Sequence, residues 1–173
     1  MIKFIIGENA SGKSLYLDNI IKADLDNHSE VEFVTNTYEI KNDNIEYDKD
    51  RLSVLEDISG AEEIDTSNSL LAIVESPVKL SKEFLQLMTI LCQKCKRAYL
   101  DEPEQGLSEY EINILSSFLM QAGRTYEDMV IVTHSELLIQ IPNCVYATPK
   151  MRDNTADIIL QNVKDGDKFE VID

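Results

Sequence analysis

The residues best suited to chemistry occupy positions 7 to 14, which run Gly-Glu-Asn-Ala-Ser-Gly-Lys-Ser. This pattern is typical of glycine-rich loops whose backbone N–H groups hold phosphate oxygens. The lysine would reach the β- and γ-phosphates of a nucleoside triphosphate, and the final serine hydroxyl would bind Mg²⁺. The predicted nucleotide-binding residues are Gly7, Glu8, Asn9, Ala10, Ser11, Gly12, Lys13, Ser14 and Leu15.

A β-prone apolar run precedes this loop, and a helical pattern follows it. Residues 2–6 are mostly Ile and Phe, whereas Leu15, Leu17, Ile20 and Ile21 recur at helical spacing. A strand that turns through glycines into a helix aims N–H groups and the positive helix end at an anion. The context favours a phosphate site over a chance glycine-rich turn.

Two adjacent carboxylates follow a later apolar run. Residues 98–100 are Ala-Tyr-Leu, and Asp101 and Glu102 come directly after them. A strand that ends here places both carboxylates at the carboxyl edge of a sheet, where ligands of open α/β sheets bind. We expect Asp101 to hold the metal and Glu102 to polarise the attacking water as general base. The alternative is a strand that simply runs into a polar turn.

A third candidate is His134, which follows the apolar residues 130–132 and Thr133. An imidazole at the C-terminal end of a strand could face a γ-phosphate. A lone histidine in this position is more often structural. The order of glycine loop, Asp-Glu pair and Thr-His pair favours the functional interpretation.

The elements that must position these residues alternate along the chain. Residues 39–66 are rich in Asp and Glu, and we expect short irregular pieces there with at most a helical turn at 52–58. We predict a C-terminal hairpin over 158–172 with its turn at 164–167. The predicted strands are 2–6, 31–35, 70–74, 97–100, 129–133 and 144–147, and the predicted helices are 13–24, 81–94, 108–123 and 136–139. This alternation predicts one α/β domain, residues 1–173, with a mostly parallel sheet flanked by helices.

The motifs together resemble the nucleotide-binding domain of ATP-binding-cassette (ABC) ATPases. The match lies in residues 7–14, 100–103, 105–108 and 133–134, which correspond to Walker A, Walker B with the catalytic glutamate, the D-loop and the switch histidine. It extends from residue 1 to about residue 147. The resemblance implies a P-loop fold, ATP and Mg²⁺ as cofactors, and domains that pair around bound ATP. The site residues that it implies are Lys13, Glu102 and His134 for catalysis, and Ser14 and Asp101 for the metal.

The sequence also departs from the family pattern. The signature motif survives at best as Leu80-Ser81-Lys82-Glu83-Phe84, without glycines. Ser81 is either a helix N-cap or a contact to a partner's γ-phosphate, and the sequence leaves both open. Asn36 is the best substitute for the glutamine loop, and Ser108 replaces the usual aspartate. No adenine-stacking aromatic residue precedes the loop, so the choice between ATP and GTP is open.

Two further comparisons with the family limit which kind of family member we expect. The interval from Lys13 to Asp101 is shorter than in transporter domains, which implies a reduced helical subdomain. No long heptad arms interrupt the chain, so we do not expect a chromosome-organising member.

Cys92 and Cys95 form a single CxxC pair, which favours packing over zinc binding.

Composition limits the class of protein. The chain has 173 residues, 43% of them hydrophobic, and three cysteines, which give no disulfide framework. We predict a cytoplasmic protein without a signal peptide or membrane span. The net charge of −16 opposes nucleic-acid binding, because duplex binders need a positive face.

Three hypotheses of function follow. The first is an ATP hydrolase in which ATP drives homodimerisation that acts on a soluble protein partner or a membrane subunit. The second is a non-hydrolysing ATP-binding regulatory or interaction module, which the degenerate residues 80–84 favour and the intact Asp101-Glu102 pair opposes. The third, a small-molecule kinase, ranks last because few arginines are available for a lid.

Overall fold

The computed structural model describes the backbone of residues 2–7, 10–27, 33–37, 45–61, 63–65, 72–74, 79–142, 145–152 and 155–161. Side chains are described for these ranges except for 63–65, 72–74 and 145–161. Among the helices so described, none has the length and apolar character needed to cross a membrane.

A six-stranded sheet in the order β2-β5-β6-β1-β7-β8 forms the centre of the molecule. In this order, β2, β5, β6, β1 and β7 each pair in parallel with their neighbours, and β8 pairs antiparallel with β7. The pattern agrees with the predicted α/β class, because parallel neighbours require crossover connections. The strand bounds are β1 Ile2–Ile5, β2 Phe33–Thr35, β5 Arg97–Asp101, β6 Asp128–Val132, β7 Val145–Arg152 and β8 Thr155–Gln161.

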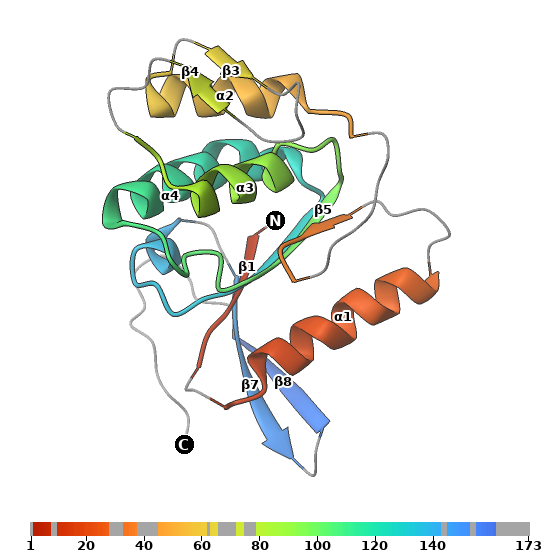
Figure 1. Ribbon diagram of the computed structural model, residues 1–173. Coiled ribbons are helices and arrows are strands. Elements are labelled where there is room, and N and C mark those ends of the chain that lie inside the picture. The colour runs from red at the N-terminus through yellow and green to blue at the C-terminus, as the bar shows by residue number, and fades with distance from the viewer. Residues whose placement is uncertain are drawn as a thin grey trace.

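Helices cover both faces of this sheet (Figure 1). Helices α3 (Lys82–Leu91) and α4 (Glu109–Ala122) lie on one face, and α1 (Lys13–Asn27) lies on the other. Two short 3-10 helices, η1 (Gly123–Thr125) and η2 (Leu138–Gln140), follow α4 and β6.

Alternation along the strands gives each helical layer its own core. Phe4, Leu100 and Ile131 pack with the α3 and α4 side, whereas their neighbours Ile5 and Val132 pack with the α1 side. All five are fully buried. Successive strand side chains point to opposite faces, so the apolar runs in β1, β5 and β6 supply both cores at once.

The acidic region was wrongly expected to be irregular. Helix α2 (Lys49–Ser59) occupies its centre, packs on α4, and buries Leu55 in the larger core. Asp48 caps this helix by accepting hydrogen bonds from the backbone N–H groups of Asp50 and Arg51. The abundant carboxylates hid a spaced set of apolar residues and a clear N-cap, which together suffice for a helix.

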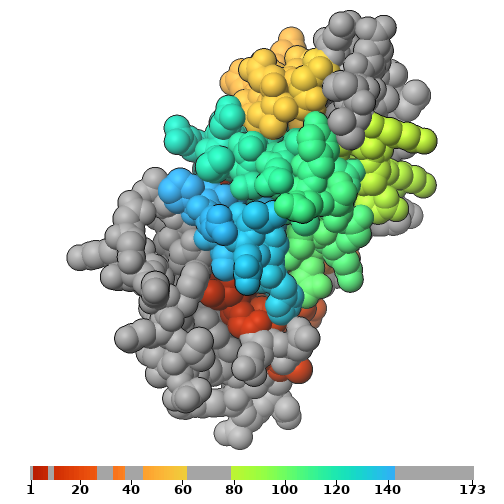
Figure 2. All heavy atoms as spheres, turned by 90° about the vertical axis from the view of Figure 1, so that its left-hand side faces the viewer, coloured from red at the N-terminus to blue at the C-terminus, as the bar shows by residue number. Residues whose placement is uncertain are grey.

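A small antiparallel pair, β3 (Glu63–Asp65) and β4 (Ala72–Val74), lies beside α2 at one end of the molecule (Figure 1). In the space-filling view, α2, α4 and the segment that leads to residue 142 form one continuous surface, which the N-terminal segment meets at its lower edge (Figure 2). In the described residues, the segment between β2 and β5, where the sequence predicts a reduced helical subdomain, contains α2, this small pair and α3.

A C-terminal hairpin is present in the described residues, but it is not the one predicted. Residues Thr155–Gln161 form β8 and pair with β7, from Tyr146 opposite Gln161 to Arg152 opposite Thr155. The sequence between these strands is Asp153-Asn154, two residue types common in turns. The predicted turn at 164–167 lies outside the described residues, so the predicted hairpin over 158–172 stays a prediction.

Candidate functional site

The glycine-rich loop joins β1 to α1, as predicted. Gly7 and Gly12 have positive φ angles of 146° and 91°, conformations that favour glycine. Ala10 also has a positive φ, 62°, so the loop is held in an unusual backbone shape. The Nζ of Lys13, a residue only 5% exposed, donates a hydrogen bond to the Gly7 carbonyl at 3.1 Å. The predicted site residues Glu8 and Asn9 lie outside the described residues.

The serines of this loop differ in their surroundings. Ser11 Oγ is buried and has no hydrogen-bond partner in the part of the chain that the structure describes. Ser14, at the first turn of α1, lies beside the carboxylate of Asp101, whose pKa the Ser14 hydroxyl lowers as a hydrogen-bond donor. The pair brings the start of α1 next to the end of β5. Leu15, also a predicted nucleotide-binding residue, is 40% exposed on α1.

Asp101 has the features of a metal ligand. Its Oδ1 is buried and finds no hydrogen-bond donor among the described residues. Burial raises the pKa of this carboxyl and the Glu102 charge adds to the increase, while the Ser14 hydroxyl and the Lys13 ammonium counteract it. An unpartnered buried oxygen beside a serine hydroxyl fits Mg²⁺, which binds through a few oxygen ligands and keeps several waters. Ser14 and Asp101 are the residues that would hold it.

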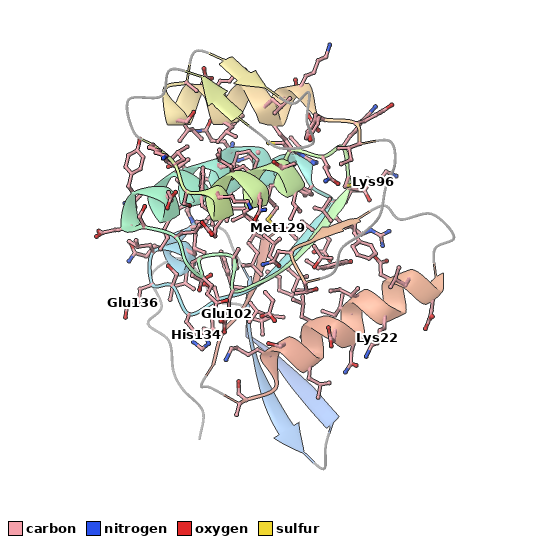
Figure 3. All side chains as sticks on the ribbon, viewed as in Figure 1. Lys22, Lys96, Glu102, Met129, His134 and Glu136 are labelled. Carbon is pink, nitrogen blue, oxygen red and sulfur yellow. The ribbon has the colours of Figure 1, made fainter. Side chains whose placement is uncertain are left out.

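Glu102 and His134 meet at the carboxyl edge of the sheet (Figure 3). The His134 Nε2 lies 3.3 Å from the Glu102 Oε1, and both side chains are about two-fifths exposed. The Glu102 backbone N–H donates to the Val132 carbonyl at 2.8 Å, which continues the pairing of β5 and β6. Glu102 has a φ of 44°, which is uncommon for a residue with a Cβ and costs about 1–3 kcal/mol. Such strain clusters at functional sites.

Asn36 lies directly after β2, and its side chain contacts the backbone of Asp101, the candidate metal ligand. Its Nδ2 donates to the Asp101 carbonyl and its Oδ1 accepts from the Asp101 N–H, each at 2.8 Å. The side chain therefore replaces the next pair of strand hydrogen bonds, beyond the last register pair of β2 and β5. Both polar groups of the Asn36 amide are used on Asp101.

The two helices that follow the predicted signature and D-loop are tied together at their N-termini. Ser81 is the N-cap of α3, and Ser108 is the N-cap of α4 in a capping box with Glu111. The Glu111 carboxylate also accepts from the Ser81 N–H. Burial alone would raise the pKa of Glu111, but the hydrogen bonds from Ser81 and Ser108 outweigh it and lower that pKa. The structure thus shows Ser81 as a helix cap.

Sequence reasoning missed one residue of this site, Glu104. Its Oε1 accepts hydrogen bonds from the segment that carries His134. Glu104 stands in an acidic loop, where a glutamate is ordinarily solvent-exposed, so its type alone gave no signal. The only available signal was its position, two residues after a candidate catalytic glutamate.

The CxxC pair shows no sign of a metal site. No group of three His, Cys, Asp or Glu side chains in the described ranges could hold a metal ion. Cys92 is fully buried in the larger core, and burial raises the pKa of its thiol to about 12. A thiol of this kind stays protonated at neutral pH and acts as a small apolar side chain.

Comparison with known proteins identifies the fold. No protein-family model and no curated protein matches the sequence. An SMC head domain from Thermotoga maritima is similar in structure, with a TM-score of 0.64, 12% identity, and coverage of 94% of this chain and 90% of that one. A protein described as a cobalt transport ATP-binding protein is also similar in structure, with a TM-score of 0.55 and 15% sequence identity. The match covers 85% of this chain and 64% of that one.

A third match, an RNase-L inhibitor, gives a TM-score of 0.52 and 14% identity, and this chain spans 32% of its length. Identities this low establish the fold and nothing more. The chain has the α/β fold of ABC-type P-loop ATPases, which transporter ATP-binding domains and SMC heads share. The expectation that the chain is no chromosome-organising protein stays a prediction, because an SMC head is among the similar folds.

Proposed function

We propose that this chain, which has the fold of ABC-type ATPases, binds ATP with Mg²⁺ and hydrolyses its terminal phosphoanhydride bond. One observation carries the proposal: the Ser14 hydroxyl, at the end of the glycine-rich loop, lies beside the Asp101 carboxylate, and the parallel pairing of β1, β6 and β5 brings their ends to one edge. This proximity supports a single site for the predicted phosphate ligands and the predicted base. The buried, unpartnered Ser11 Oγ and Asp101 Oδ1 are groups that a phosphate and a cation would satisfy.

Binding of the triphosphate rests on the loop and the first turn of α1. Backbone N–H groups at the start of this 15-residue helix would donate to a bound triphosphate, and the helix dipole favours an anion there. Lys13 would exchange its hydrogen bond to the Gly7 carbonyl for oxygens of the β- and γ-phosphates. Mg²⁺, when bound by Ser14 and Asp101, would neutralise part of the phosphate charge.

Hydrolysis needs a base close to the γ-phosphate. Glu102 would accept a proton from water as the water oxygen bonds to the γ-phosphorus and the bond to the bridging oxygen of ADP breaks. His134, 3.3 Å from Glu102, would hold that carboxylate in place and donate to a γ-phosphate oxygen. The products are ADP and inorganic phosphate, and the proton ends on solvent.

We further propose that ATP brings two copies of the chain together and that the dimer acts on a protein partner. Glu102 and His134 are 38% and 41% exposed, so the site as it stands admits bulk water on one side. A second copy would exclude that water and strengthen the electrostatic contacts inside the site. The partner is a soluble protein or a membrane subunit. Nucleic acid is a poor fit to a net charge of −16.

One observation favours a second candidate, the ATP-binding module that does not hydrolyse. The backbone N–H of Ser81 donates to Glu111 of the same chain. An N-terminus of α3 that is satisfied internally is not open to a partner's γ-phosphate unless Glu111 moves. In this candidate, the presence or absence of ATP would itself be the signal.

Phosphate release measured over a range of protein concentrations separates the two candidates. We expect release from ATP–Mg at a specific rate that rises with concentration, because the complete site forms between two copies. Lys13→Ala should abolish release by removing the phosphate contact. A nucleotide that binds but is never hydrolysed, at any protein concentration, would reject the hydrolase and favour the module. A specific rate independent of concentration would reject the dimer.

A further inference from the structure

Glu104 connects the loop after β5 to the segment after β6. A single oxygen of its carboxylate, Oε1, accepts hydrogen bonds from the Thr133 hydroxyl at 2.6 Å, the His134 N–H at 2.8 Å and the Ser135 N–H at 3.2 Å. Hydrogen bonds to an ionised acceptor are roughly twice as strong as those between neutral groups. The carboxylate thereby fixes three consecutive residues, with His134 in the middle.

Other contacts make this segment rigid. The Thr133 hydroxyl accepts from the Ser135 N–H at 2.9 Å while it donates to Glu104, which closes a small ring of hydrogen bonds. The Thr133 N–H donates to the Ile5 carbonyl at 3.2 Å and ties the segment to β1. Thr133 is only 1% exposed. The backbone of His134 therefore has a defined position before any ligand binds.

The imidazole of His134 is held less firmly than its backbone. Its side chain is 41% exposed, and the described contact of its ring is the one with Glu102. The direction of an exposed side chain follows from where its backbone is placed. Glu104 places that backbone, and Glu104 belongs to the same loop as Glu102. A turn hydrogen bond between Gln105 N–H and the Glu102 carbonyl, at 3.0 Å, keeps this loop compact.

We propose that Glu104 is a positioning residue of the ATPase site: by anchoring residues 133–135, it presents His134 to Glu102 in a preformed pair. The expected effect of Glu104 on kcat rests on the proposed hydrolysis, whereas its anchoring of residues 133–135 does not. Glu104 touches neither the reacting atoms nor the phosphate loop in the described contacts. Its effect on turnover passes through His134.

A double-mutant cycle tests this dependence. Glu104→Ala should lower kcat about 10-fold, because the hydrogen bonds that orient the His134 segment are lost, and change KM for ATP by less than about 2-fold. In a His134→Ala background, Glu104→Ala should cause no further loss, because the residue that it positions is gone. Equal losses in both backgrounds, or a kcat unchanged by Glu104→Ala, would overturn the proposal.

Two more variants sharpen the cycle. Glu104→Gln keeps an acceptor oxygen but places an amide where the buried, unpartnered Oε2 now lies, so its kcat should fall between those of the wild type and Glu104→Ala. Glu136→Ala is the control: it also removes one carboxylate, but from an exposed side chain that does not lie at the Glu102–His134 pair (Figure 3). It should match the wild type. A loss equal to that of Glu104→Ala would mean that charge alone matters, which would also reject the proposal.

Amide hydrogen exchange, measured by NMR without nucleotide, is a readout independent of turnover. In Glu104→Ala the His134 amide should exchange at least about 10-fold faster than in the wild type, since it loses its acceptor. The Glu102 amide, which donates to Val132, should keep its rate. Unchanged exchange at His134 would refute the anchor even if the protein hydrolyses ATP. Faster exchange in a protein without turnover would refute only the proposed function.

Discussion

At the scale of single residues, the backbone of Glu102 combines strain with chemistry. Its φ of 44° places a side chain where glycine is preferred, yet the carboxylate thereby reaches His134. The Glu102 N–H bond to Val132 holds the residue in this conformation from the β6 side. A strained residue persists only where the surrounding structure fixes it and function benefits.

Replacing Glu102 by glycine or alanine separates the strain from the chemistry. Both variants lose the His134 contact and the base, so turnover should fall about 10²-fold or more in each. Only glycine also relieves the backbone, so Glu102→Gly should be more stable than Glu102→Ala by roughly 0.5–1 kcal/mol after the entropy of the unfolded glycine is deducted. Urea unfolding of the two variants measures the difference. Equal stability, or a more stable alanine variant, would show that the backbone is relaxed.

Asn36 is predicted to matter for the metal and not for the nucleotide. Asn36→Ala removes both hydrogen bonds that hold the Asp101 backbone, so Asp101 should present its carboxylate less precisely. We expect the Mg²⁺ concentration for half-maximal turnover to rise about 10-fold, as for other outer-shell partners of metal ligands. Thr37→Ala is the matched control, because the Thr37 contacts are with Thr35. A parallel loss of metal-free nucleotide affinity would point to damage of the whole site instead.

Residue types indicate candidate reacting groups better than they indicate the residues that hold those groups in place. Lys13, Asp101 and Glu102 could be proposed from the sequence because phosphate and metal chemistry calls for those types after a glycine-rich loop and at a strand end. Glu104 and Asn36 act through hydrogen bonds to backbone atoms 30 or more positions away. Such pairings depend on which strands are neighbours, which sequence patterns do not specify.

At the scale of elements, Arg51 anchors α2 to the rest of the molecule. Its guanidinium donates to the Gln93 and Cys95 carbonyls at 2.6 and 2.8 Å and to the Thr125 hydroxyl at 2.9 Å. The same group stacks on the Tyr126 ring, 3.6 Å from its centroid. The residue is 2% exposed, and five planar donors in a fixed fork suit this role.

Breaking this anchor should destabilise the fold without touching the site. Arg51→Met removes the guanidinium donors to the Gln93 and Cys95 carbonyls and to the Thr125 hydroxyl, and we expect the free energy of unfolding to fall by about 3–5 kcal/mol. Arg51→Lys keeps the charge but not the fork, and should lose less. Denaturant unfolding measures both, and nucleotide affinity of the folded protein should stay within about 2-fold. A loss below about 1 kcal/mol for Arg51→Met would contradict the anchor.

The elements were predictable where apolar periodicity was strong. The strands β1, β5 and β6 and the helices α1, α3 and α4 follow their apolar patterns closely. Helix α2 was predicted only as a helical turn at 52–58, because its stability comes from Asp48, Leu55 and the Arg51 contacts more than from a broad apolar stripe. The β7–β8 hairpin was not predicted, because the sequence offers a second turn signal at 164–167, which lies outside the described residues.

At the scale of the whole molecule, strand order explains why the site exists. The neighbours β5, β6 and β1 carry Asp101 and Glu102, His134, and the glycine-rich loop at their carboxyl ends. Parallel strands bring these ends to one edge, although the residues lie far apart in sequence. The chain as a whole carries a net charge of −16, so Lys13 and the helix dipole would have to supply the attraction for a triphosphate locally.

We propose above all that one site holds ATP and that Glu102 acts as the general base for its hydrolysis. The most direct measurement is the nucleotide retained after wild type and Glu102→Gln are incubated with ATP–Mg²⁺ and rapidly desalted, with Lys13→Ala as the control. We predict intact ATP on Glu102→Gln, ADP or no nucleotide on the wild type, and none on Lys13→Ala. Equal ADP on wild type and Glu102→Gln, or ATP retained equally by Lys13→Ala, would contradict the account.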